Sequence, residues 1–197
     1  EMLAKVDALL PGMAAPTIPE RAAPQLAFEQ LCFETSAPGK EAERAALSRE
    51  AWMACVGEVD PGALTEAGYP CFGGLDLSRT RDFTAFTLVW VLDDTPDEWE
   101  LRSATWFWTP ADTLEHRARV DGPPYPAWAR EGFIEPVPGN RVSYRWVAKA
   151  LAQLCAAHRP TLIGCDEYGL DQLREHLSEE GVDLPITSHP QGFQRRV

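Results

Sequence analysis

The chain has 197 residues, enough for one large domain or one domain with an arm, and its hydrophobic content of 45% is ordinary for a globular protein. Its formal net charge of -12, from 18 basic and 30 acidic residues, argues against tight nonspecific binding to nucleic acid unless basic residues gather locally. No stretch approaches the roughly 18 to 20 apolar residues of a membrane span, and no secretory signal begins the chain, so we expect a cytoplasmic protein with no membrane partner.

The first 68 residues are predicted to form a helical arm. Helical patterning in EMLAKVDALL, PQLAFEQLCFE and SREAWMACV alternates with connectors rich in Pro and Gly, and Ser48 is a candidate cap of the third helix. We therefore expect a linker or arm over residues 1–68 and one domain over residues 69–197.

From Tyr69 the pattern changes to three strands. The runs PCFGGLDLS, DFTAFTLVWVL and EWELRSATWFW are apolar and rich in β-branched and aromatic residues. Their connections, SRTRD and DDTPDE, are short and turn-like, which predicts antiparallel hairpins.

The rest of the chain alternates helices and strands. PADTLEHRARVDG and PYPAWAREG predict short helices, FIEPVPGN a brief extended piece, and VSYRWVAKALAQLCAAHRP the longest helix, which ends at Pro160. TLIGCDEYG predicts a buried strand, LDQLREHLSEEG an amphipathic helix and VDLPITSHP a last strand. Three antiparallel strands followed by alternating helix and parallel strand predict an α/β domain of the ribonuclease H-like class, with a mixed sheet flanked by helices.

Two acids stand at the ends of strands that this fold places side by side. Asp76 lies in the first strand, and Asp166 directly follows the apolar TLIGC of the first strand after the long helix. Both carboxylates are therefore expected to face one metal site. Carboxylate oxygens suit Mg²⁺ or Mn²⁺, and two such ions about 3.5 to 4 Å apart activate water and stabilise the leaving oxygen in phosphodiester hydrolysis.

Each acid also has an ordinary structural explanation. Asp76 could cap a turn at the end of its strand, and Asp82 could be a hairpin residue that bonds the backbone of Thr80 or Arg81. Glu167 follows Asp166 directly and is expected to point away from it. Asp82 remains a candidate third catalytic acid beside Asp76 and Asp166.

Four arginines are candidate DNA contacts. Arg79 and Arg81 lie in the first hairpin connection, while Arg141 and Arg145 lie four residues apart at the start of the long helix. Phosphate binding and ordinary solvated arginines are both open interpretations. Trp128, within PYPAW, is the tryptophan that we expect to be exposed if any stacks on DNA.

Other chemistries find little support. The five cysteines are odd in number and include no CxxC pair, and the four histidines form no HExxH or HxH pair. Neither a disulfide framework nor a zinc site is indicated.

Several motifs together resemble the nuclease domain of the terminase large subunits of tailed phages. They are CFGGLDLSRTRDFTAFTLVW, PYPAWAREGFIEPVPGNRV, LIGCDEYG and the terminal QGF, and the resemblance covers roughly Ser48 to Phe193. It implies a metal-dependent endonuclease that cuts concatemeric double-stranded DNA at the start and end of genome packaging. Carried over, Asp76 and Asp166 match metal ligands, and Asp82 matches an acid often present beside them.

The resemblance also implies partners: double-stranded DNA, an ATPase domain of the same polypeptide, the small terminase subunit and the portal protein. The implied location is the host cytoplasm, with transient docking on the viral procapsid. Two departures stand out. No GxxxxGK[ST] loop occurs, so we expect no ATPase activity from this chain, and the family's third metal-binding Asp, on a helix after QGF, is absent. We therefore expect a fragment that lacks the ATPase domain and is truncated at its C-terminus.

Two other functions remain open. One is a noncatalytic DNA-clamping or motor-docking module with the same fold, which would bind DNA but not cut it in Mn²⁺. The other is a different ribonuclease H-like nuclease, such as a junction resolvase or transposase, which would select branched or transposon-end DNA.

Overall fold

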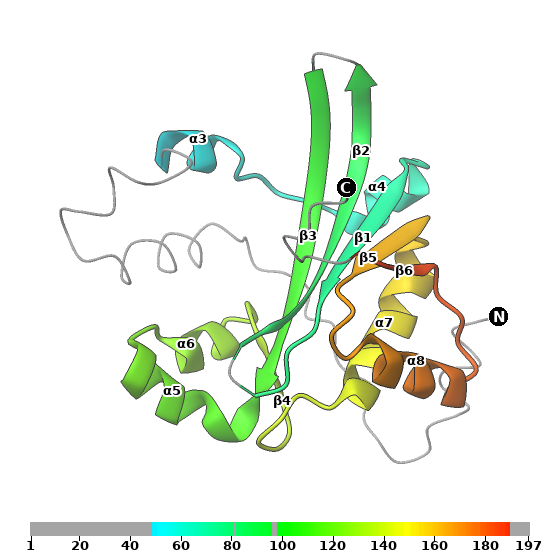
Figure 1. Ribbon diagram of the computed structural model, residues 1–197. Helices are drawn as coiled ribbons and strands as arrows, with labels where there is room; N and C mark the ends of the chain where they lie inside the picture. Colours follow the sequence, from blue (N-terminus) through cyan, green and yellow to red (C-terminus); the bar gives the residue numbers. More distant parts are fainter. Residues whose placement is uncertain (1–48, 81, 96–97, 190–197) are drawn as a thin grey trace, which may run out of the picture.

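The computed structural model describes residues 49–80, 82–95 and 98–189. The helices expected before residue 49, the cap Ser48, the candidate DNA contact Arg81 and the QGF motif lie outside the described residues. Figure 1 shows a twisted sheet with a long projecting hairpin, and most of the helices lie beside the lower part of this sheet.

The described strands form a six-stranded mixed sheet in the order β4-β3-β2-β1-β5-β6. Their bounds are β1 Cys71–Asp76, β2 Thr84–Thr95, β3 Glu98–Pro110, β4 Glu135–Val137, β5 Leu162–Cys165 and β6 Ile186–Ser188. Strands β1, β2 and β3 pair antiparallel, and β5 lies parallel beside β1. The two short strands extend the edges in parallel, β4 on β3 and β6 on β5. The predicted ribonuclease H-like sheet is confirmed.

The long hairpin of β2 and β3 is amphipathic at its base. Phe86, Leu88 and Trp90 are fully buried at alternate positions, as expected for strands that turn one face to a core. The register shifts between Val91 and Asp93, and beyond this irregularity the hairpin is exposed, with Trp99 66% accessible. The hairpin projects beyond the rest of the sheet in Figure 1.

The helices make two groups. Their bounds are α3 Arg49–Ala54, α4 Pro61–Glu66, α5 Leu114–Asp121, α6 Tyr125–Arg130, α7 Tyr144–His158 and α8 Leu170–Glu179, with a 3-10 turn at Ala111–Thr113. Helices α7 and α8 share the main core with the sheet, whereas α5 and α6 form a smaller cluster at its lower end (Figure 1).

Helix α7 follows its predicted pattern. Val147, Leu151 and Leu154 recur at helical spacing and are buried against the sheet. The helix ends at Arg159, which adopts a left-handed conformation with φ 50° and donates its N–H to the Cys155 carbonyl. Pro160 cannot continue the helix, so the expected end is confirmed to within two residues.

Trp128, the tryptophan considered for stacking on DNA, is a core residue. This side chain is 1% accessible and packs in the smaller cluster with Leu114, Tyr125 and Ile134. The short α5–α6 unit has few apolar residues of its own, so the largest of them supplies its core. Trp128 is therefore unavailable for stacking on DNA.

Helix α4 was not expected from the sequence. Asp60 caps it, accepting a hydrogen bond of 3.0 Å from the Ala63 N–H, and Pro61 occupies the first turn. Leu64 packs against the main core, and the Thr65 hydroxyl lies 3.2 Å from Nδ1 of His158 at the end of α7. No described helix is long and apolar enough to cross a membrane.

Candidate functional site

The central feature of the site is a pair of aspartates at the ends of adjacent parallel strands. Asp76 is the last residue of β1, and Asp166 directly follows β5. Leu75 and Cys165 are register partners, so the residue after each of them is an aspartate. The expected adjacency of Asp76 and Asp166 follows from this register.

Both carboxylates affect the pKa of one buried side chain, the thiol of Cys165. The pKa of the Cys165 thiol is raised to about 11, first by burial and then by the negative charges of Asp166 and Asp76. Asp76 is exposed and Asp166 is partly exposed, so the carboxylates remain open to solvent above this thiol. Strand alternation puts Asp76 on the same face of β1 as Phe72, which is 40% accessible.

Asp166 is partly oriented by the loop that follows it. Its Oδ1 accepts a hydrogen bond of 2.6 Å from the Glu167 N–H. The Glu167 carboxylate instead accepts a bond of 3.2 Å from the Ser188 hydroxyl of β6. Glu167 is thus directed to the edge strand, as its position next to Asp166 led us to expect.

Asp82 lies in the connection between β1 and β2. Its Oδ1 accepts a hydrogen bond of 2.9 Å from the Phe83 N–H, and its side chain is exposed. The connection is closed by Thr84, whose hydroxyl accepts from the Ser78 N–H at 3.1 Å and donates to the Ser78 carbonyl at 2.8 Å. The structure therefore gives Asp82 a local backbone contact.

The donor chemistry of the pair suits a divalent cation. Mg²⁺ and Mn²⁺ prefer oxygen ligands, and Mg²⁺ is usually bound through one or two carboxylates while keeping several waters. Within the described ranges, no group of three or more His, Cys, Asp or Glu side chains could hold a metal ion. Asp76 and Asp166 thus supply two ligands, and the remaining ones must be water, substrate oxygen or groups outside those ranges.

The candidate arginines divide into two kinds. The Arg79 carbonyl accepts a hydrogen bond of 2.8 Å from the Val142 N–H, which brings the β1–β2 connection against the segment that carries exposed Arg141. Arg145 instead faces α8, with its Nε 3.3 Å from a Glu180 carboxylate oxygen and a second, 4.0 Å contact to Glu179. Arg79 and Arg141 form the candidate basic rim, whereas Arg145 is neutralised locally.

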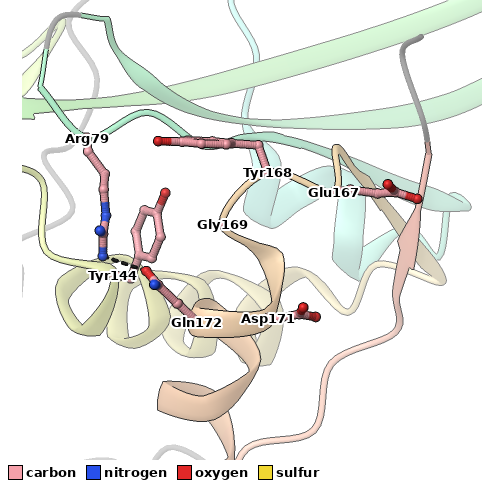
Figure 2. Close-up of a pocket in the computed structure, with 7 residues that line it drawn as sticks. All are labelled: Arg79, Tyr144, Glu167, Tyr168, Gly169, Asp171 and Gln172. Atoms are coloured by element: carbon pink, nitrogen blue, oxygen red, sulfur yellow. Dashed lines mark hydrogen bonds between the residues drawn. The ribbon is translucent and has the colours of Figure 1, made fainter.

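A pocket of about 260 Å³ lies at the loop that follows Asp166. It is lined by Arg79, Tyr144, Glu167, Tyr168, Gly169, Asp171 and Gln172. Figure 2 shows Arg79 beside Tyr144, with the Tyr168 ring across the opening and Gly169 at its inner wall. The pocket joins the β1–β2 connection, the start of α7 and the loop from β5 into α8, which begins at Asp166.

Tyr144, Tyr168 and Gln172 were not among the sequence-based candidates. Tyr144 and Gln172 stand in helical patterns that are typical of ordinary packing, and only their approach to Arg79 gives them a place in the pocket. Burial raises the pKa of the Tyr144 phenol, an effect that the charge of Arg79 partly opposes. A signal was present at Tyr168 and Gly169, because they lie two and three residues after Asp166, a predicted metal ligand.

Comparisons with known proteins agree with the motif resemblance. No family model matches the chain. The terminase large subunit of Enterobacteria phage HK97 is 33% identical over 148 residues, which are 75% of this chain and 28% of that protein. The crystal structure of the HK97 large terminase matches with a TM-score of 0.64 at 32% identity, covering 75% of this chain and 29% of the other. The chain thus spans less than a third of the relative that it matches. On sequence and structure alike, the chain is homologous to part of a phage terminase large subunit.

Proposed function

We propose that this chain is the nuclease part of a phage genome-packaging terminase, a metal-dependent endonuclease that cuts concatemeric double-stranded DNA. The observation that carries the proposal is the register of β1 and β5, which sets Asp76 and Asp166 side by side in an exposed position. Two adjacent carboxylates at the end of a sheet are tolerated best when a cation offsets their charge.

Each group in the site has a role in this proposal. Asp76 and Asp166 hold the metal, and the Glu167 N–H orients one oxygen of Asp166. Mg²⁺ or Mn²⁺, as two ions, would supply an activated water and charge stabilisation on the phosphodiester. Arg79 and Arg141 place the DNA backbone against the carboxylates, Asp82 lies on the same connection as Arg79, and Arg81, two residues after Arg79 in the sequence, is a further candidate contact. Local arginines can bind DNA on an acidic protein because binding depends on the field at the contact surface.

The wider role rests on the relationship to the large terminase. In that role the chain works with an ATPase domain of its own polypeptide, the small terminase subunit and the portal protein. It acts in the host cytoplasm while docked on a procapsid. The same relationship favours a packaging nuclease over a junction resolvase or transposase.

The test is nicking of supercoiled plasmid by the purified chain in Mn²⁺ and in EDTA. We expect nicking in Mn²⁺ alone and at least about a 100-fold loss in Asp76→Asn and in Asp166→Asn, because the amide keeps the side-chain shape but removes the metal-binding charge. Asp94→Asn is the matched control, since Asp94 is an exposed acid on the outer part of the hairpin. Wild-type nicking rates in both site variants would contradict the proposal.

A second candidate is a noncatalytic DNA-clamping or motor-docking module. It is favoured by the lack of a third acidic ligand among the described residues. A chain of this kind would bind duplex DNA and fail to nick it at every Mn²⁺ concentration. Comparing linear with branched DNA in the same assay tests the resolvase alternative.

A further inference from the structure

We infer that the pocket at the loop that follows Asp166 is a subsite for one nucleotide of the DNA strand being cut. Its backbone phosphate is held by the Arg79 guanidinium and the Tyr144 hydroxyl, and the Tyr168 ring contacts its sugar or base. This inference rests on the proposed function and names residues that position the substrate in it.

The first observation is an unsatisfied hydroxyl at the pocket wall. Tyr144 is 2% accessible, and its buried hydroxyl makes no hydrogen bond of good geometry with the described residues, although the Arg79 guanidinium lies close enough to oppose the rise in the pKa of the phenol. Buried polar side chains are nearly always paired, so an orphaned donor that lines a pocket points to a missing acceptor. In Figure 2 this hydroxyl points into the space between Arg79, Tyr168 and Gly169. The other unpaired buried side-chain atoms of the described chain are indole nitrogens, and none of them belongs to a residue that lines the pocket.

The second observation is the close approach of Gly169 to the Tyr144 side chain. Gly169 has φ 73°, and a Cβ there would collide with the Tyr144 hydroxyl. It is also the N-cap of the ten-residue helix α8, and no side chain caps that helix end. Asp171 and Gln172, in the first turn of α8, line the pocket, and the N-terminal end of a helix favours an anion.

The third observation is the positive charge of Arg79, which lies next to Tyr144 in the pocket wall. The Arg79 guanidinium carbon lies 4.6 Å from the centroid of the Tyr144 ring, and its Nη2 donates to Gln172 Oε1 at 2.6 Å. These contacts hold Arg79 in place and leave further N–H donors of the guanidinium for a ligand. An arginine anchored in this way matches the geometry of a phosphate.

Two acids also line the pocket, but both are directed away from its inner end. Glu167 accepts the Ser188 hydroxyl, and Asp171 lies 3.9 Å from Arg174 with its side chain 97% accessible. Figure 2 shows both carboxylates on the side away from Arg79 and Tyr144. The inner end of the pocket is therefore formed by the Arg79 guanidinium, the Tyr144 phenol and the N-terminus of α8.

The position of the pocket identifies which nucleotide it takes. Tyr168 and Gly169 follow Asp166 by two and three residues, a length of chain that spans at most about 11 Å. A phosphate in the pocket therefore belongs to a nucleotide close to the cut bond. The Tyr168 ring is 63% accessible and open to stacking, which is tolerant of base identity. This tolerance suits an enzyme that cuts with little sequence preference.

The test measures binding of the full chain to a short fluorescein-labelled DNA duplex by anisotropy, in Ca²⁺ and over a range of salt concentrations. Tyr144→Phe should bind about tenfold more weakly with an unchanged salt slope, because it loses one neutral donor to a charged phosphate. Arg79→Ala should bind at least about tenfold more weakly, with a slope smaller by about 0.9. The matched controls are Tyr69→Phe, at a partly exposed tyrosine before β1, and Arg102→Ala, at an arginine paired with Glu100 on the hairpin.

A thermal melt separates binding from folding. Tyr144→Phe should melt at or above the wild-type temperature, since the hydroxyl that it removes makes no hydrogen bond of good geometry with the described residues. Wild-type affinity in both Tyr144→Phe and Arg79→Ala would overturn the subsite. If the wild-type chain still cuts DNA in Mn²⁺, that result leaves the proposed function intact. A wild-type chain that neither binds nor cuts DNA would overturn the proposed function and the subsite together.

Discussion

Leu75 and Cys165 are register partners in the parallel pair of β1 and β5, and each is followed by an aspartate. The two buried side chains hold the strands together, and the exposed Asp76 and the partly exposed Asp166 then stand side by side at the strand ends. Like charges placed opposite each other in a sheet are destabilising. The same contact that builds the core therefore creates a site that a cation would stabilise.

Removing one of these charges should stabilise the protein without metal and abolish its response to metal. We expect Asp76→Asn to raise Tm by up to about 3 °C in EDTA, because the repulsion with Asp166 is worth about 0.2 to 1 kcal/mol. Mn²⁺ at about 100 times its Kd should stabilise the wild type by about 2.7 kcal/mol and the variant by much less. Thermal melts with and without Mn²⁺ measure both effects, with Asp94→Asn as control. Equal Mn²⁺ shifts in wild type and Asp76→Asn would rule out Asp76 as a ligand.

Asp82→Asn separates a local role from a metal-binding one. An asparagine can still accept the Phe83 N–H but carries no charge, so the loop should keep its stability to within about 0.5 kcal/mol. Because the observed contact of Asp82 is local, we expect plasmid nicking within about threefold of wild type. A loss as large as that of Asp76→Asn would make Asp82 the third ligand.

The two arginines near the start of α7 should differ in their contribution to DNA binding. Arg141 is exposed, so Arg141→Ala should make the salt dependence of binding shallower by about 0.9. Arg145 already contacts Glu180 and Glu179, so Arg145→Ala should change the slope much less. Anisotropy titrations over a salt series compare the two variants directly. Equal changes would show that DNA displaces the Glu180 contact.

Glu135 should make the protein less stable as the pH rises. Its Oε2 accepts a hydrogen bond of 2.8 Å from the Trp108 indole, and burial raises the pKa of its carboxyl from the usual 4.5. The folded state therefore keeps this proton to a higher pH than the unfolded state does. The contribution of Glu135 to the free energy of unfolding is full below pH 4.5 and is lost as the pH rises through the raised pKa.

Glu135→Gln can accept the same indole hydrogen bond and does not ionise. Its free energy of unfolding should therefore fall less than that of the wild type between pH 4.5 and neutral pH. Urea unfolding at a series of pH values measures the difference. Glu131→Gln, at an exposed glutamate just before β4, is the matched control. Parallel curves for wild type and Glu135→Gln would show that the Glu135 pKa is not raised.

Local pattern was enough to predict most of the elements and the two principal acids. The strands were predicted from alternating apolar residues, the turns from short connections with Asp and Pro, and α7 from its helical repeat. Each of these patterns involves only residues that are close in the sequence. The fold class followed from the order of these elements, and the position of Asp166 followed from the end of an apolar run. Helix α4 was missed because its six residues are too few to show a helical period.

The features that give the site its detail depend on contacts between distant residues. Trp128 is buried because the α5–α6 unit packs on itself, and Arg145 is neutralised because α8 lies beside α7. The Tyr144 side chain lies in the pocket wall because Arg79, 65 positions earlier, and Gly169, 25 positions later, both pack against it. Residue type and spacing along the chain do not predict these contacts, because they depend on how the whole chain packs around the sheet.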